Sequence, residues 1–339
     1  MPEGVTFILL AVLVLAVGFD YINGFHDSAN AIATSVSTRA LRPHVAIVMS
    51  AAANFVGALT GTAVAKFVAS GIVVTPEGHE GQIVVAAALV GAIVWNVVTW
   101  RLGIPSSSSH ALIGGMIGGT LAAVWIGGQT GGLDINGIVT KVLFPLVASP
   151  LLGIGIGFVL MVGIFTIFRR ARPRLMNDGF RRLQVVSAGF MAFSHGSNDA
   201  QKTMGVITLA LVSAGLLASP EIPTWVIILS ATAISLGTAA GGWRIMKTMG
   251  QKVVKLDPVH GFAAETTAAG IILTASHFGM PVSTTHVISS AIMGVGSSDR
   301  FSAVRWGVAG NIVRAWILTI PLSAVTAAMA WVALNATIG

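Results

Sequence analysis

Apolar residues in this chain fall in long runs separated by short polar stretches. The runs are too long for barrel strands and do not alternate between apolar and polar positions, so they predict helices. They cover roughly residues 5–19, 45–68, 83–100, 111–127, 138–168, 183–194, 203–217, 225–243, 259–276, 285–296 and 306–335. Because a span needs about 20 apolar residues, we expect an all-α polytopic membrane protein with about ten spans plus half-helices.

The composition supports this class. Hydrophobic residues make up 54% of the 339 positions and charged residues 9%, where a soluble domain carries about 25% charged residues. The chain contains no cysteine, which excludes disulfides, thiolate metal sites and thiol catalysis. Residues 1–18 show neither a basic leading segment nor a small-residue cleavage site, so we expect a retained first span rather than a signal peptide.

Four polar, glycine-containing stretches interrupt the apolar pattern, and we expect broken helices or re-entrant helical hairpins there. They are residues 23–30, 105–110, 195–202 and 281–286. The sequence GFHDSAN of the first stretch aligns with GSNDAQK of the third, and GIPSSSSH around the second aligns with GMPVSTTH around the fourth, each about 170 positions later. The chain therefore contains an internal duplication, with repeats at 1–168 and 183–339 joined by a short Arg-rich loop at 169–182.

Charge is distributed unevenly between the loops. Fifteen of the 19 Lys and Arg residues are assigned to one side, including the whole cluster at 169–182, and five acidic residues to the other, namely Glu3, Glu77, Glu80, Asp134 and Glu221. By the positive-inside rule the loop 169–182 is cytoplasmic and both termini lie outside. The formal charge of +7 then reflects topology and not nucleic-acid binding. An odd number of crossings per repeat inverts the second repeat, which is typical of secondary transporters with a midplane site.

Two acidic residues, Asp27 and Asp199, stand at equivalent positions of the duplication. An ionised carboxylate in the membrane is costly unless it faces a cavity or a cation, so we expect both to bind the coupling ion or accept a proton. Neighbouring side chains add oxygen and nitrogen atoms that suit a coupling cation or a proton relay. These are Asn23, His26, Asn30 and Asn198.

The hydroxyl runs form a second candidate site. Each run follows a proline and begins an apolar helix, so side-chain hydroxyls and free backbone amides are expected to point at one anion. The residues are Ser106, Ser107, Ser108, Ser109, Ser283, Thr284 and Thr285. Ordinary N-capping is the alternative interpretation. Two such helix ends facing each other from inverted repeats would suit a multiply charged oxyanion.

Further polar residues fall at predicted membrane depth. Lys202 and Arg314 are cations available to the anion or to the acidic residues, with snorkelling as the alternative for Arg314. Glu265 is a candidate coupling-ion ligand or a buried partner for Arg314. His110 and His286 end the two hydroxyl runs and are either hydrogen-bonded within the hairpins or members of a proton relay.

Together these paired motifs resemble the duplicated signatures of the inorganic phosphate transporter (PiT) family, and FSHGSND at 193–199 is most similar to its bacterial Pit-type branch. The resemblance implies an inverted-repeat phosphate permease in the bacterial inner membrane, with phosphate held by the hydroxyl runs. It also implies cation and phosphate contacts at Asp27, Asn30, Asn198 and Asp199. That branch is described as proton-coupled and able to carry metal–phosphate complexes.

Two positions depart from the sodium-coupled members of the family, which commonly have Asn where this chain has His26 and Lys202. A fixed ammonium would repel a sodium ion about 4 Å away. The sequence therefore favours import of phosphate by proton symport, with sodium symport as the alternative and with no cofactor or structural metal. Whether a divalent metal travels with phosphate, and whether the protein forms a homodimer, stays open.

Other functions fit the sequence less well. A permease for a related oxyanion such as sulfate is the alternative substrate, but the acidic and Asn acceptors favour phosphate, which can donate hydrogen bonds. An enzyme of the intramembrane serine hydrolase type needs one nucleophile with a base folded onto it, whereas here the serines adjoin histidine and the run is duplicated with Val282 and threonines. A channel would not explain paired acidic segments beside anion sites.

Overall fold

The computed structural model describes residues 7–338, apart from the side chain of Trp243, and these residues are almost entirely helical. The elements are α1 (Phe7–Ser37), α2 (Pro43–Ala58), α3 (Ala63–Ser70), β1 (Val73–Val74), α4 (His79–Leu102), α5 (Ser108–Trp125), β2 (Gly132–Leu133), α6 (Ile135–Ile138), η1 (Val139–Leu143), α7 (Phe144–Ile167), α8 (Pro173–Ser213), α9 (Thr224–Ala240), α10 (Trp243–Lys247), η2 (Thr248–Lys252), α11 (Pro258–His277), α12 (Thr284–Asp299), η3 (Phe301–Ala303) and α13 (Trp306–Ile338). The strands form one antiparallel pair with Val73 opposite Leu133.

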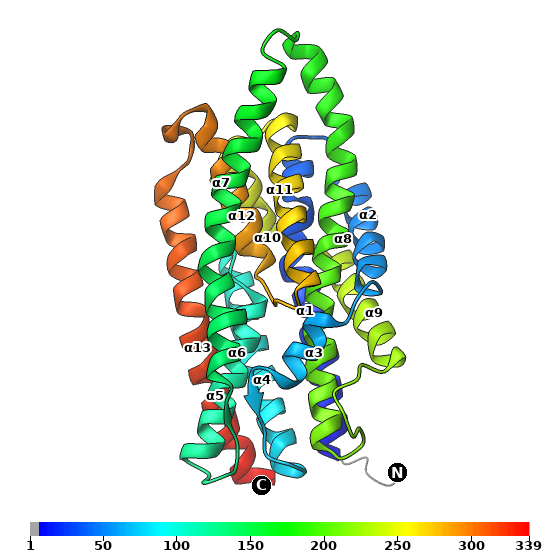
Figure 1. Cartoon of the computed structure of the whole chain (residues 1–339), viewed down its shortest axis with the longest axis vertical. Helices are drawn as coiled ribbons and strands as arrows, with labels where there is room; N and C mark the ends of the chain where they lie inside the picture. The colour runs from blue at the N-terminus through cyan, green and yellow to red at the C-terminus, as the bar shows by residue number, and fades with distance from the viewer. Residues whose placement is uncertain (1–6, 339) are drawn as a thin grey trace.

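Two helical hairpins stand where the sequence places its proline-hydroxyl motifs. α4 packs against α5, and α11 against α12. Each turn begins with a glycine in the left-handed region, Gly103 and Gly279, both at φ +66°, a conformation that side chains with a Cβ adopt reluctantly. Figure 1 shows α4–α5 toward the end where α1 begins and α13 ends, and α11–α12 toward the opposite end. The two predicted re-entrant hairpins are thus confirmed.

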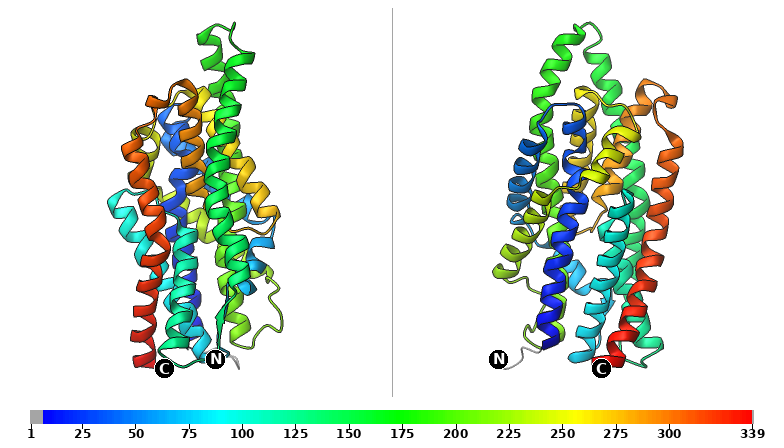
Figure 2. Two further views of the ribbon diagram at one scale, coloured as in Figure 1. Left: turned by 60° about the vertical axis from the view of Figure 1, so that its left-hand side comes forward. Right: turned by 180° about the vertical axis from the view of Figure 1, so that it is seen from behind.

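The two halves of the chain run in opposite directions. The start of α1 and the end of α13 lie at one end of the molecule, and the connection between α7 and α8 lies at the other (Figures 1 and 2). The halves also exchange partners, since α7 of the first repeat packs on α12 of the second and α13 packs on α5. This arrangement is the inverted duplication predicted from the sequence.

The expected number of about ten spans is not confirmed. Four helices are long and apolar enough to cross a bilayer within the described residues, and up to six if each bent pair counts as one span. The bent pairs are α2 with α3, at 69°, and α9 with residues 244–252, at 61°. Several of the apolar runs are therefore half of a hairpin or half of a bent pair.

The expected breaks at residues 23–30 and 195–202 are wrong. α1 and α8 continue as α-helix through both stretches. The glycines there serve close helix crossings instead. A Cβ on Gly24 would lie 2.2 Å from the Ile234 carbonyl oxygen of α9, and a Cβ on Gly237 would lie 2.0 Å from the Tyr21 carbonyl oxygen.

The second repeat shows the same crossing. A Cβ on Gly196 of α8 would lie 2.2 Å from the Asn54 carbonyl oxygen of α2, and a Cβ on Gly57 would lie 2.0 Å from the Phe193 carbonyl oxygen. The breaks in the spans occur elsewhere, after α2 and after α9. Glycine in a membrane helix thus marks backbone contact here rather than interruption.

The apolar core consists of two clusters with polar helix segments between them. Residues 8–19 of α1 contribute to one cluster and residues 29–33 to the other. In α8 the order is reversed, with Phe180, Met191 and Ala192 in the second cluster and residues between 200 and 211 in the first. The polar residues of both helices are consequently held at the middle of the molecule.

Candidate functional site

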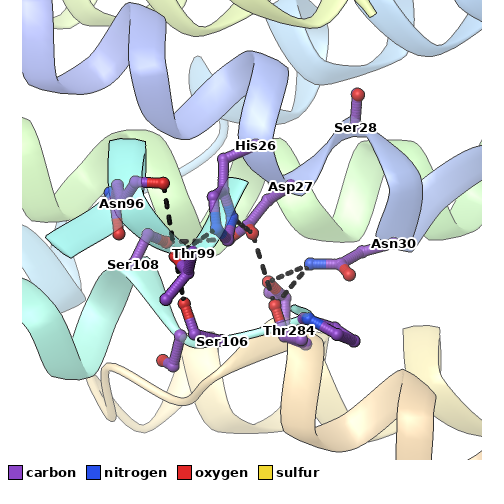
Figure 3. A network of polar contacts seen from close by, with 12 residues as sticks. His26, Asp27, Ser28, Asn30, Asn96, Thr99, Ser106, Ser108 and Thr284 are labelled. Atoms are coloured by element: carbon purple, nitrogen blue, oxygen red, sulfur yellow. Dashed lines mark hydrogen bonds and ion pairs between the residues drawn. The ribbon is translucent and has the colours of Figure 1, made fainter. Parts of the chain in front are cut away.

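Asp27 lies in the C-terminal half of α1, where both hairpins reach it. The Ser108 hydroxyl of α5 donates to Asp27 Oδ2 over 2.7 Å, and the Thr285 hydroxyl of α12 donates to Oδ1 over 3.3 Å. His26 Nδ1 lies 2.6 Å from the same Oδ1. Figure 3 shows this carboxylate among side chains from α1, α4, α5 and α12. One carboxylate thus joins the tips of both hairpins.

Asp199 holds the equivalent place on α8. It accepts a hydrogen bond from the Thr284 hydroxyl over 3.0 Å. The Lys202 ammonium, one turn later, contacts Asp199 Oδ1, and His195 Nε2, one turn earlier, lies 2.9 Å from Oδ2. All of these groups are buried. Each acidic residue therefore has a hairpin hydroxyl on one side and a nitrogen base of its own helix on the other.

Side chains of each repeat also bind the hairpin of the other repeat. Asn30 Nδ2 donates to Thr285 Oγ1 over 2.8 Å. Lys202 contacts Ser109 Oγ in the hairpin of the first repeat, and it also donates to the Val282 carbonyl of its own repeat over 3.0 Å. These bonds close the site across the boundary between the repeats.

The seven predicted hydroxyls divide into three groups by their partners. Ser107 and Ser283 are N-caps, which accept from the backbone N–H of the residues three positions later over 3.1 and 3.2 Å. Ser106 donates to Thr99 over 2.9 Å. The other four, Ser108, Ser109, Thr284 and Thr285, contact the acidic residues, Asn30 or Lys202. The N-capping interpretation thus describes two of the seven hydroxyls.

His110 and His286 meet where the hairpins meet. Their ring centroids are 4.8 Å apart, and His286 stacks on Trp316 at 4.0 Å. Neither ring nitrogen of His286 has a hydrogen-bond partner among residues 7–338. The two histidines, each directly after a hydroxyl run in the sequence, are therefore residues through which the two hairpins contact each other.

Glu265 and Arg314 do not contact each other. Glu265 is buried and accepts from Thr34 over 2.5 Å and from Gln184 over 3.1 Å, with Ser187 as a further donor. Arg314 is exposed and donates to Asn311 over 3.4 Å. Of the two interpretations of Glu265, the pairing with Arg314 is wrong, because neutral hydrogen-bond donors already surround the carboxyl group.

Within residues 7–338, the remaining predicted residues do not contact Asp27 or Asp199 through a hydrogen bond of their own. Asn198 Nδ2 binds Ser276 Oγ over 2.8 Å, which ties α8 to the second hairpin. Asn23 is buried on α1. Arg101 and Arg244 are two of the fifteen basic residues assigned to the cytoplasmic side, and they meet at the turn of the first hairpin, where Arg244 donates to the Arg101 carbonyl over 2.9 Å.

Sequence reasoning missed His195 and Thr99. His195 Nδ1 lies 3.1 Å from Asn54 Oδ1, so the ring links Asp199 to α2. Its spacing of four residues from Asp199 on one helix is a signal that could have found it. Thr99 lies 3.1 Å from His26 Nε2, and because 73 positions separate the two, no local pattern points to it.

A cation could in principle be shared at this centre. Asp27, His195 and Asp199 each place one ligand atom within 4.8 Å of the others. The Lys202 ammonium, however, already lies against Asp199. The centre thus contains a cation that belongs to the chain.

Comparison with known proteins agrees with this geometry. A model of the phosphate transporter family matches residues 23–177 and 168–327, once on each repeat. A probable low-affinity inorganic phosphate transporter of Bacillus subtilis is 47% identical over 327 residues, covering 96% of this chain and 97% of the relative. One from Rhizobium meliloti is 47% identical over 336 residues, covering 96% of each chain. A solved structure, the sodium-dependent phosphate transporter, superposes with a TM-score of 0.88 at 27% identity, covering 98% of this chain and all of the other. The chain therefore belongs to the phosphate transporter family, a family of transporters and not of enzymes.

Proposed function

We propose that this protein imports inorganic phosphate in symport with protons. The observation that carries the proposal is the meeting of two oppositely directed hairpin helices, α5 and α12, whose first-turn hydroxyls converge on two buried carboxylates. Helix N-termini attract anions, and the hydroxyls can donate to an anion in place of the carboxylates. The names of the bacterial relatives support the substrate.

Phosphate fits the centre better than sulfate does. Near neutral pH phosphate carries protons that it can donate, whereas sulfate only accepts hydrogen bonds. The buried Asn30 Oδ1 and Asn198 Oδ1 have no partner among the described residues, and Asp27 and Asp199 are acceptors nearby. Buried acceptors of this kind favour a ligand that brings hydrogen.

Lys202 supports protons over sodium as the coupling ion. Its ammonium contacts Asp199 and Ser109 and so stands where a mobile cation would otherwise balance the carboxylate. A sodium ion at this place would meet a like charge. The solved structure that superposes on this chain is a sodium-dependent phosphate transporter with 27% identity. Sodium symport is therefore the alternative.

The residues would then divide by role. Phosphate is held by Ser108, Ser109, Thr284, Thr285, Asn30 and Lys202, with Ser106, Ser107 and Ser283 shaping the hairpin ends. Asp27, Asp199 and His26 handle the coupling proton, with Asn23 and Asn198 as polar neighbours. Glu265 belongs to a separate hydrogen-bonded group, so we assign it a secondary part in coupling, and we assign His110 and His286 to a relay at the hairpin interface. A metal ion, if present, would enter as part of the phosphate substrate.

Uptake of labelled phosphate by proteoliposomes under separately imposed gradients tests the proposal. An inward proton gradient should drive accumulation, and an inward sodium gradient at equal pH should not. Asp27→Asn and Asp199→Asn should each abolish gradient-driven uptake, because an amide keeps the size of the carboxyl group but binds no proton. Accumulation driven by sodium alone would overturn proton symport, and efficient competition by sulfate would overturn phosphate selectivity.

The cellular setting follows from the same proposal. Comparison with bacterial relatives and the apolar spans support a place in the bacterial inner membrane, with the Arg-rich loop 169–182 in the cytoplasm and both termini outside. A homodimer is compatible with the broad apolar outer faces of α7 and α13. Chemical crosslinking in membranes tests it.

A further inference from the structure

A cavity of about 520 Å³ lies alongside α12 from His286 to Met293, between that helix, α7 and α13. The described residues that line it are mostly aliphatic or aromatic and include no Asp, Glu, Lys or Arg. Val147 of α7 and Ile317 of α13, two of the lining residues, are exposed. Both helices are long and apolar enough to span a bilayer, so their exposed apolar faces meet lipid. A molecule dissolved in the membrane can therefore reach the cavity.

One polar side chain of the cavity wall has no hydrogen-bond partner. The Ser290 hydroxyl and the indole N–H groups of Trp306 and Trp316 each donate to a backbone carbonyl, over 2.9, 2.9 and 3.3 Å. His286 is fully buried, and across the described part of the chain neither of its ring nitrogens has a partner. A neutral imidazole presents one N–H and one lone pair, and leaving buried polar atoms unpaired is costly. The wall thus offers one unused hydrogen-bonding group.

Water fits this cavity poorly. A buried water molecule needs several polar partners, whereas the hydroxyl and indole groups of the wall already donate to the backbone. An alkyl chain of a lipid would fill the apolar space but would leave His286 unpaired. The cavity instead suits a molecule that brings an apolar body together with one hydroxyl or carbonyl group. Its volume lies in the range of small-molecule sites, about 300 to 1,000 Å³.

We propose that the cavity binds a neutral, ring-containing molecule of the lipid phase whose single hydroxyl or carbonyl group forms a hydrogen bond with His286. Trp306 and Trp316 line the cavity from α13, and indole rings pack well against other flat rings. The rise of an α-helix separates these two positions by about 15 Å along α13, which leaves room for a fused ring system beside them. A charged ligand is disfavoured, because no lining side chain would balance its charge.

The cavity and the transport centre share α12 but use different side chains. Thr284 and Thr285 donate to the carboxylates of α8 and α1, whereas the ring of His286, the next residue, stacks on Trp316 of α13 at 4.0 Å. Consecutive side chains leave a helix in different directions. The inference therefore goes beyond the proposed transport function and does not depend on which ion is coupled to phosphate.

The test uses pyrene and 1-hydroxypyrene, two probes of one shape that differ by a hydroxyl group, with the protein in liposomes. Binding is recorded as energy transfer from tryptophan to the probe, since Trp306 and Trp316 line the cavity. The hydroxylated probe should bind about five- to tenfold more tightly than pyrene, the factor expected for one hydrogen bond. In His286→Phe, which keeps a ring but has no ring nitrogen, the two affinities should become equal. The alcohol 1-dodecanol, which carries a hydroxyl group on a flexible chain, should displace 1-hydroxypyrene only weakly.

A leucine at position 310 should fill the cavity. Gly310 lines the space, and a Cβ built on it meets nothing within 4 Å. In Gly310→Leu, saturable binding of both probes should be lost while phosphate uptake stays at the wild-type level, since Gly310 lies on α13 outside the transport centre. Gly307→Leu is the matched control. Gly307 lies one turn earlier on α13 with equally open space around its Cβ, and it is not a lining residue, so this variant should bind both probes as the wild type does.

Several outcomes would overturn the assignment. They are equal affinities of the two probes for the wild type, unchanged binding by Gly310→Leu, and displacement of 1-hydroxypyrene more strongly by 1-dodecanol than by pyrene. Probe binding confined to the monomeric fraction after crosslinking would also overturn it, because a second copy of the chain would then cover the cavity. The affinity ratio in His286→Phe tests the hydrogen bond separately, so the result does not rest on the folding of the glycine variants alone.

Discussion

Asn30 of the first repeat donates a hydrogen bond to Thr285 of the second over 2.8 Å. In the inverted sense, Lys202 of the second repeat contacts Ser109 of the first. Each long polar helix therefore binds the hairpin of the opposite repeat. Neither repeat contains a complete site, because the acidic residues and the hydroxyls that face them come partly from different halves of the chain.

Adjacent hydroxyls at the second hairpin should behave differently. Thr284 faces Asp199, so Thr284→Ala should weaken phosphate binding by about 0.5 to 3 kcal/mol with little change in stability. Ser283 caps α12, so Ser283→Ala should lower the free energy of unfolding by about 0.5 to 2 kcal/mol. Binding calorimetry and thermal unfolding in detergent separate the two. Equal losses of affinity in both variants would show that the cap hydroxyl contacts phosphate as well.

The glycine crossing of α1 and α9 should tolerate no side chain. In Gly237→Ala the new Cβ would lie 2.0 Å from the Tyr21 carbonyl oxygen, so the helices must separate and the variant should unfold at a lower temperature. Gly270→Ala on α11 is the matched control, because nothing lies within 4 Å of its Cβ. Replacing this helix glycine should be neutral or slightly stabilising. Equal melting temperatures would contradict the crossing.

The internal duplication and the hydropathy pattern made the main features of the fold predictable from the sequence. The repeated proline-hydroxyl motifs predicted both hairpins, and the asymmetric charge predicted the opposite directions of the two halves. The helix breaks at 23–30 and 195–202 were predicted wrongly, because a glycine among polar residues has the same local pattern whether it interrupts a helix or allows a neighbour to approach. Only the positions of Ile234 and Asn54 decide between these cases.

The same limit applies to the site. Asp27, Asp199 and the hydroxyls could be found because they recur in both repeats. Thr99 recurs in no motif, and its contact with His26 depends on how α4 packs against α1. A pairing of Glu265 with Arg314 was one alternative suggested by charge alone, but the sequence does not show that Thr34 and Gln184 donate hydrogen bonds to Glu265.

The base of the second hairpin should be sensitive to pH. His260, in the first turn of α11 at the Arg-rich end, lies 2.8 Å from Asp257 and 3.0 Å from Asp299. Burial lowers the pKa of His260, but hydrogen bonds and charges from the two acidic residues outweigh burial and raise the pKa above its ordinary value. The imidazolium then joins the start of α11 to the end of α12.

A raised pKa fixes the sign of the effect. The stabilisation is fully present below the ordinary histidine pKa of about 6.5 and is lost as pH rises through the raised value. The difference in melting temperature between the wild type and His260→Gln should therefore be largest in mildly acidic buffer and shrink in alkaline buffer. A difference that grows with pH would show that His260 is neutral in the folded protein.

The last prediction concerns orientation, and the absence of native cysteine makes it direct to test. Thr130, after α5, and Asp178, early in α8, are exposed. Figure 1 shows these two segments toward opposite ends of the molecule. Because the arginines cluster around Asp178, Thr130→Cys should react with an impermeant maleimide in intact spheroplasts, and Asp178→Cys only after permeabilisation. The reverse pattern would invert the orientation and make the Arg-rich loop external. Labelling of both sites from outside would contradict the inverted arrangement itself, since the halves would then no longer end on opposite sides of the membrane.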